Sequence, residues 1–217
     1  EQRKASTLRQ IGSANLDYQS DGGLGFSLQY SNYRLDQEVV VDTILNDSIL
    51  LNQINHQVSV APRFFKSTKT ATHTLVLVAG WQELDDRNPG TGDLVDNQVL
   101  MANLNYSGFL KPGKWRLSAG VNAFRLTSSV VGNDRYGAHL GLGKTLGQKL
   151  TIRTKLAYNL LMRESETGSN YSLNGTLRYA FSKKMGLEAI VGQLTNDFGD
   201  RAFSELRGRV RFNYRWR

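Results

Sequence analysis

Apolar and polar residues alternate with a period of two along most of the chain, and this pattern restricts the possible folds more than any other feature. The clearest case is the stretch 205–216. One face of that stretch carries Leu206, Gly208, Val210, Phe212, Tyr214 and Trp216. The opposite face carries Glu205, Arg207, Arg209, Arg211, Asn213 and Arg215. A β-strand separates two such sets completely, whereas a helix would scatter both around its circumference. The pattern therefore predicts β-structure.

The same reading along the chain predicts eleven strands. Each is close to the length that a tilted strand needs to cross a bilayer. Two stretches, 75–78 and 99–110, lack clean alternation. The predicted strands are 7–19, 24–36, 50–66, 71–85, 98–110, 115–128, 135–146, 150–164, 170–181, 186–195 and 202–216.

Two kinds of connection alternate between these strands. Short turns are expected at 20–23, 67–70, 111–114, 147–149 and 182–185, and generally longer polar loops at 37–49, 86–97, 129–134, 165–169 and 196–201. Barrels of the outer membrane have short periplasmic turns and longer outer loops, so the alternation favours such a barrel. Mean hydropathy is −0.40. No stretch approaches the roughly 20 apolar residues of a spanning helix, which excludes a helical membrane protein.

Composition removes several other classes. The chain has no cysteine, so a disulfide-stapled domain, thiol catalysis and a cysteine metal site are excluded. The formal net charge is +8, which in a soluble protein would suggest nucleic-acid binding. Here the positive charges occupy alternating strand positions and turns instead of one patch. We therefore expect no nucleic-acid partner.

The last strand, with Val210, Phe212, Tyr214 and Trp216 on one face, resembles the C-terminal assembly signal of Gram-negative outer-membrane β-barrels. Arg217 follows the final aromatic, a small departure. The loop containing 46–48 resembles those of large Bacteroidetes-type barrels. The resemblance covers nearly all of the chain. It implies an all-β, antiparallel up-and-down transmembrane barrel of about twelve strands in the outer membrane. It also implies contact with the lipid bilayer and lipopolysaccharide, and recognition of the last strand by the barrel assembly machinery.

The strand count is odd, whereas single-chain bacterial barrels have an even number of strands. We therefore expect residues 1–217 to form one outer-membrane barrel domain that lacks an upstream strand or N-terminal region, as the C-terminal part of a larger barrel protein or as a processed product. A missed strand, an odd-stranded barrel and a barrel shared between chains are the alternatives.

The predicted interior is basic. Its acidic residues are expected to be Asp17, Glu188 and Glu205. One hypothesis is an anion-attracting lumen. The simpler interpretation, which the sequence favours, is a solvated or salt-bridged interior that fills a narrow barrel. The predicted lumen-facing basic residues are Arg116, Arg153, Lys155, Arg178, Arg207, Arg209 and Arg211.

No catalytic or metal site can be assembled from the spacing. His56, His73 and His139 are the only histidines and lack metal-ligand spacing. The pair 85–86 suggests the aspartates of barrel proteases, but the matching Asp-x-His is absent. We therefore expect no enzyme activity, cofactor or bound metal.

Three functions are consistent with these observations. The first is a membrane anchor or scaffold, or a component of an envelope complex with protein partners. The second is an outer-membrane pore for small anionic solutes. The third is a soluble ligand-binding β-barrel.

Overall fold

The computed structural model describes residues 4–40, 53–86, 96–128, 132–163, 166–182, 184–198 and 202–214. No helix in this part of the chain is long and apolar enough to span a membrane. The strands are β1 (Lys4–Gln19), β2 (Leu24–Val40), β3 (Gln53–Val60), β4 (Arg63–Ser67), β5 (Ala71–Asp86), β6 (Asn97–Leu110), β7 (Trp115–Ser128), β8 (Asn133–Leu146), β9 (Leu150–Arg163), β10 (Thr167–Ala180), β11 (Met185–Asp197) and β12 (Phe203–Tyr214).

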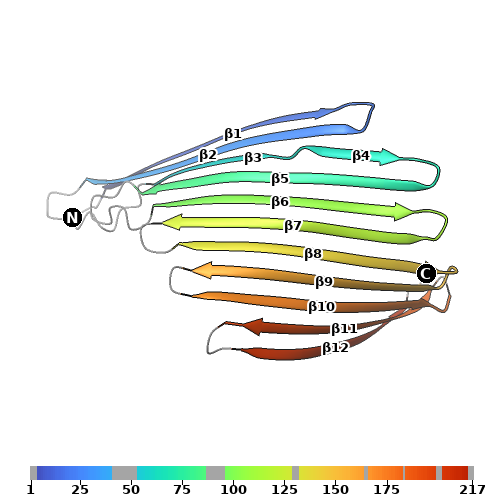
Figure 1. Cartoon of the computed structure of the whole chain (residues 1–217). Helices are drawn as coiled ribbons and strands as arrows, with labels where there is room; N and C mark the ends of the chain where they lie inside the picture. The colour runs from blue at the N-terminus through green and yellow to red at the C-terminus, as the bar shows by residue number, and fades with distance from the viewer. Residues whose placement is uncertain are drawn as a thin grey trace.

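All twelve strands form one antiparallel sheet in which neighbours in the chain are neighbours in space (Figure 1). The predicted all-β, up-and-down fold is confirmed. So is the number of spans, because β3 and β4 both lie between β2 and β5 and together make one span. The sequence predicted one strand at 50–66. It is interrupted at Pro62, which has no backbone N–H to donate to a neighbouring strand, although its carbonyl still accepts from Leu77.

Short turns join the strands at one end of the sheet, which we call the turn end. Its connections are 20–23, 68–70, 111–114, 147–149 and 181–184. Gly23 and Gly147 adopt positive φ there, of 84° and 60°, a conformation that glycine adopts without steric cost. The opposite end is the loop end. The β1–β2 hairpin extends there to the pair Lys4 and Val40, beyond the predicted strand limit at 36. Residues 41–52 and 87–95, within or beside two predicted long loops, lie outside the described residues.

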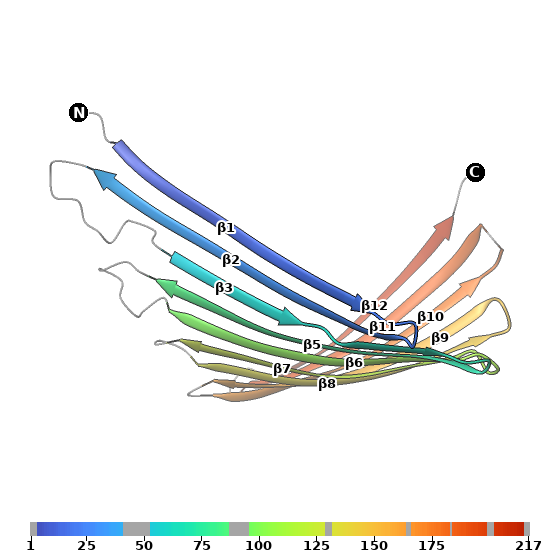
Figure 2. The ribbon, with the colours of Figure 1, turned by 90° about the horizontal axis from the view of Figure 1, so that it is seen from above.

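The sheet is curved into an open trough (Figure 2). In the described chain β1 pairs only with β2, and β12 only with β11. These two strands therefore form the two margins of the trough. Side chains alternate between a convex and a concave face, and the register assigns each residue to one of them.

The two faces differ in chemistry. The convex face carries large apolar side chains that are open to the surroundings, such as Leu140 at 62% exposed and Val210 at 70%. The only buried hydrophobic residues in the described chain are Ile54 and Ala71. The surface area is 15540 Å², whereas a soluble monomer of this mass exposes about 10,000 Å². A soluble ligand-binding barrel would need an apolar core that this sheet does not have.

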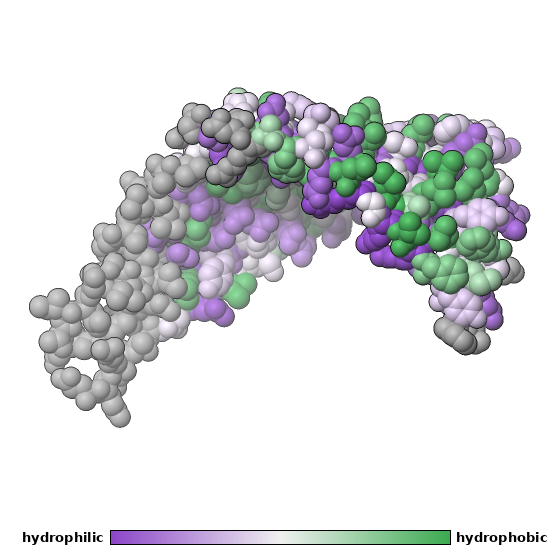
Figure 3. Space-filling model, turned by 90° about the horizontal axis from the view of Figure 1, so that it is seen from below, coloured by the Kyte–Doolittle hydropathy of each residue, from purple (hydrophilic) through white to green (hydrophobic). Residues whose placement is uncertain are grey.

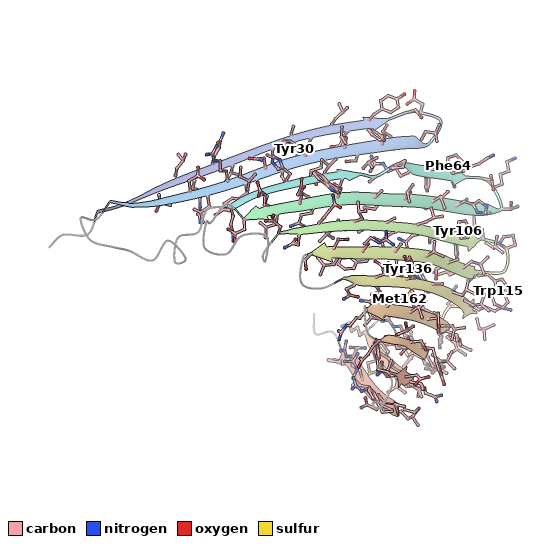
Figure 4. The ribbon with its side chains drawn as sticks, turned by 60° about the vertical axis from the view of Figure 1, so that its left-hand side comes forward. Tyr30, Phe64, Tyr106, Trp115, Tyr136 and Met162 are labelled. Atoms are coloured by element: carbon pink, nitrogen blue, oxygen red, sulfur yellow. The ribbon has the colours of Figure 1, made fainter. Side chains whose placement is uncertain are left out.

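Aromatic side chains lie toward both ends of the convex face. Figure 4 shows Phe64 and Trp115 near the turn end, and Tyr136 nearer the loop end. The ammonium group of Lys144 lies 4.4 Å from the centre of the Trp115 ring. Rings with one polar edge favour the headgroup level of a bilayer. The convex face thus has the organisation of a lipid-contacting surface.

Candidate functional site

The basic residues that the sequence assigns to the interior all lie on the concave face of β7 to β12. We call Arg116, Arg153, Lys155, Arg178, Arg207, Arg209 and Arg211 the concave basic cluster. Each of the seven is exposed, and Figure 3 shows mostly hydrophilic residues within the hollow of the trough. Strict alternation brings them to one face, because basic residues recur at every second position of β9 and β12.

The register shows that the cluster is continuous across strands. Arg116 lies opposite Gly143 of β8, and Gly143 lies opposite Arg153 of β9. The same row continues through Thr176 and Ile190 to Arg209 of β12. Residues separated by more than 90 positions in the sequence, such as 116 and 209, therefore share one row.

The rows on either side extend the cluster. The row nearer the turn end links Arg178 to Glu188 and then to Arg211. The row nearer the loop end contains Lys155 and Arg207. All seven basic residues therefore lie in three adjacent rows of the sheet.

Two carboxylates neutralise part of this charge. Arg178 donates from Nη2 to Oε1 of Glu188 at 3.1 Å, and the Glu188 side chain is only 12% exposed. Arg207 donates from Nη2 to Oε2 of Glu205 at 2.6 Å. The guanidinium of Arg116 lies 5.6 Å from the centre of the Phe109 ring, a cation–π contact. Seven basic side chains against two carboxylates leave a clear positive excess on this surface.

A small cavity of about 30 Å³ lies inside the cluster. The side chains of Arg153 and Arg178 line it together with two threonines and Glu188. Guanidinium groups present several N–H donors in a planar fork, which suits carboxylate and phosphate oxygens. The arrangement can therefore bind small anions by charge and by hydrogen bonding.

Glycines on the concave face keep space beside the charged groups. A Cβ added at Gly143 would lie 3.2 Å from Cγ of Arg153 and 3.6 Å from Cβ of Arg116. On the convex face, a Cβ added at Gly12 or Gly208 would meet nothing within 4 Å. Gly143 therefore makes room for the long arginine side chains beside it, whereas Gly12 and Gly208 lie at open positions of the margin strands.

Four further basic residues lie on the concave face and were not selected from the sequence: Arg9, Arg63, Arg135 and Arg163. Arg63 donates from Nη2 to the Gln19 side chain at 3.1 Å, and Arg9 lies 5.8 Å from the centre of the Tyr33 ring. The alternation in the sequence could have identified these four residues, because each immediately precedes or follows an apolar residue of the convex face.

The expected acids Asp17, Glu188 and Glu205 are also on the concave face.

The histidines do not form a common site. His56 and His73 lie on the convex face, and Nδ1 of each ring is hydrogen-bonded to a tyrosine hydroxyl. The partner of His56 is Tyr30 at 3.0 Å, and the partner of His73 is Tyr106 at 2.8 Å. His139 lies on the concave face between Gly120 and Ala157. Within the described chain, no group of three or more carboxylate and histidine side chains could hold a metal ion. The absence of a bound metal or cofactor stays a prediction.

Two larger hollows, of about 490 and 560 Å³, lie on the convex face and are mainly apolar. Alanines such as Ala102 and Ala119 form part of their floors, and Trp81, Leu100 and Leu140 are among the larger side chains that line them. Lipid chains fill irregularities of this kind on a membrane-facing surface. We therefore place the candidate site on the concave face.

The predicted C-terminal assembly strand corresponds to β12. Val210, Phe212 and Tyr214 lie on its convex face and are exposed by 70%, 60% and 45%. Trp216 lies outside the described residues.

Solved outer-membrane proteins resemble this chain in fold. OmpT of Vibrio cholerae, an outer-membrane protein solved in a trimer form, superposes with a TM-score of 0.51 at 8% identity and full coverage of both chains. The chain has the fold of Gram-negative outer-membrane β-barrels. The outer-membrane location expected from the sequence agrees with this neighbour. An outer-membrane channel of Pseudomonas putida F1 has a TM-score of 0.46 at 12% identity, over 98% of this chain and 85% of the channel. The sequence matches no family model and no curated protein.

The expectation that the chain is not an enzyme needs correction. The similar solved structures include LpxR of Salmonella typhimurium, a lipid A deacylase, with a TM-score of 0.32 at 9% identity over 93% of this chain and 87% of LpxR. One fold supports both enzymes and proteins without catalytic activity. The expectation rested on the failure to assemble a catalytic site from residue spacing, and this was wrong as a ground for excluding an enzyme, because a fold brings together residues that are distant in the sequence.

Proposed function

We propose that this chain forms the wall of an outer-membrane pore that favours small anionic solutes. The observation that supports the proposal is the concave basic cluster, with its positive excess facing the hollow of the sheet. An anchor or scaffold, the first hypothesis from the sequence, does not require such a surface. The cluster also argues against the salt-bridged interior that the sequence favoured, because among the described residues only Glu188 and Glu205 form ion pairs with its members.

Electrostatics would give this wall its selectivity. Charged side chains that surround a narrow aqueous path bias which ions enter it. Low-dielectric walls of one sign also focus the field and raise the local concentration of the opposite ion. Arginine binds carboxylates and phosphates through paired hydrogen bonds, so solutes carrying those groups are the favoured class.

The test is ion selectivity in planar bilayers, measured as the reversal potential across a KCl gradient. The native protein should prefer chloride to potassium. A triple variant, Arg153→Gln, Lys155→Gln and Arg209→Gln, removes three cluster charges that form no ion pair with another described residue. It should lose most of that preference while still inserting. The matched control, Lys111→Gln, Lys114→Gln and Lys149→Gln, removes the same charge from the turns and should change selectivity little.

Two results would contradict the proposal. One is a protein that inserts but does not conduct, which would favour the anchor or scaffold. The other is equal selectivity in the native protein and the triple variant, which would show that the cluster does not face the conducting path.

Several finer expectations are part of this proposal. We propose that the convex face contacts lipid and lipopolysaccharide, and that β12 is the strand which the assembly machinery recognises. The exposed row of Val210, Phe212 and Tyr214 supports the second point. An origin in Bacteroidetes-type bacteria rests on the loop resemblance alone.

A further inference from the structure

The two margins of the sheet cannot close on each other in the way that its other strands pair. Eleven antiparallel spans separate the outer edge of β1 from that of β12, so the first and last spans run in the same direction. Both begin at the loop end and finish at the turn end. Direct pairing of β1 with β12 would be parallel, whereas every pair in the described sheet is antiparallel.

Both margins also carry backbone that needs a partner. Every residue from 7 to 19 of β1 is exposed, and Leu206 of β12 is 74% exposed. Within the hydrocarbon of a bilayer no water is present to satisfy N–H and C=O groups, and each unpaired group costs several kcal/mol. An open sheet edge therefore does not persist in lipid, and something must pair with both strands.

A second copy of the chain does not meet this need. Copies inserted in the same orientation would present β1 and β12 running in one direction, from loop end to turn end. Any seam between copies, whether β1 with β12, β1 with β1 or β12 with β12, would then be parallel. An occupant that continues the antiparallel pairing of the described sheet runs the opposite way, from turn end to loop end.

Any odd number of added strands would pair antiparallel with both margins, and one is the smallest such number. We propose that a single strand, supplied by a segment of the same polypeptide upstream of residue 1, fills the gap between β1 and β12 and closes the barrel at twelve spans. Such a strand would reach the loop end where β1 begins and would join it by a hairpin, as consecutive strands do throughout the sheet. It would pair antiparallel with both margins. The proposal is independent of what the barrel conducts.

The chemistry of the margins constrains the new strand. On β12 the concave positions 207, 209 and 211 are all arginine. Like charges directly opposite each other destabilise a strand pair. The concave positions of the inserted strand that face these arginines should therefore be acidic or neutral, and its convex positions apolar.

Cysteine pairs test the closure, because the chain has no cysteine. Gly208→Cys on β12 is combined in turn with Gln10→Cys, Gly12→Cys, Ala14→Cys or Leu16→Cys on β1, all convex positions, in the full-length protein in outer membranes. An inserted strand places the margin Cα atoms about 10 Å apart, beyond the roughly 7 Å limit for a disulfide. No pair should oxidise to a disulfide, and at least one should react with a bifunctional thiol reagent that spans about 10 Å.

The control is Val191→Cys with Gly208→Cys. These positions are direct partners on β11 and β12, so the pair should form a disulfide in high yield. A disulfide between β1 and β12 would overturn the proposal in favour of direct closure. Failure of both reagents at all four pairs, with the control working, would also overturn it, because one strand would then not fill the gap.

A photo-crosslinker attached to Gly208→Cys identifies the occupant. After irradiation and digestion, mass spectrometry should recover a β12 peptide joined to a peptide from upstream of residue 1, in addition to products with β11. Capture of a β1 peptide, of a peptide from another protein, or of β11 alone would each overturn the assignment to the same polypeptide.

Discussion

Two sections of the concave surface share one architecture but differ in chemistry. Along β5 and β6 the concave side chains are hydroxyls, amides and small or apolar groups, with Asp86 the only charged residue among them. Along β7 to β12 the same face carries the concave basic cluster. The convex face is apolar over both sections, with residues such as Leu77 and Leu104 on one and Leu140 and Leu173 on the other.

The difference shows which side of the sheet is constrained. Lipid contact requires apolar side chains on the convex face wherever a strand crosses. The concave face has no such requirement, so its composition can differ from one section to the next. A basic section beside a neutral one would place the positive charge to one side of the proposed conducting path.

The sharpest test of the two faces uses neighbouring residues in the middle of β10. Leu173→Arg puts a charge on the convex face and should destabilise the protein by about 2–4 kcal/mol, the usual cost of arginine at the bilayer midplane of a barrel. Asn174→Arg puts the same side chain on the concave face and should cost far less. Equilibrium unfolding by urea in lipid vesicles measures both. Equal costs would mean that the faces are wrongly assigned.

A smaller effect is expected from packing on the concave side. A Cβ added at Gly120 would lie 2.9 Å from the carbonyl oxygen of Leu104 and would also collide with His139. Gly120→Ala should therefore cost about 1–3 kcal/mol, the usual range for overpacking. Gly208→Ala, on the open convex side, should leave the unfolding free energy nearly unchanged. If the two variants unfold alike, the crowding of the concave side does not affect stability.

The smallest effect concerns the ion pairs within the basic section. Glu188→Gln leaves Arg178 beside a neutral, largely buried amide and should cost about 1 kcal/mol, close to the net value of one hydrogen bond. Glu205→Gln acts on a more exposed pair and should cost less, since exposed ion pairs contribute about 0–1 kcal/mol. In planar bilayers both variants should raise the preference for chloride. A lower preference would contradict the assignment of these acids to the conducting path.

The sequence predicted most of the spans because the convex face imposes strict alternation on them. β12 and β9 alternate clearly, since charged concave residues contrast with apolar convex ones. Alternation was weak at 75–78 because Val76 and Val78, which are concave, are as apolar as the convex Leu75 and Leu77. Alternation was also weak at 99–110, because Val99 and Met101 lie on the concave face and are themselves apolar.

Other features needed three-dimensional pairing. The break at Pro62 could have been anticipated from proline alone, but its position between β2 and β5 depends on the register of both neighbours. The seven residues of the basic cluster were correctly placed on one face. Their arrangement into three adjacent rows could not be read from the sequence, because it depends on which residues of β7 to β12 lie opposite one another.

The near absence of an apolar core has a consequence for how this polypeptide reaches its final state. A chain whose large hydrophobic side chains mostly stay exposed on a convex face gains little from collapsing in water, and the proposed contact with lipid would supply the missing stability. With that contact, folding and membrane insertion would be one event, because the convex face finds an apolar environment only in the bilayer. The low mean hydropathy of −0.40 follows from the same arrangement, because only every second residue of a membrane-crossing strand needs to be apolar.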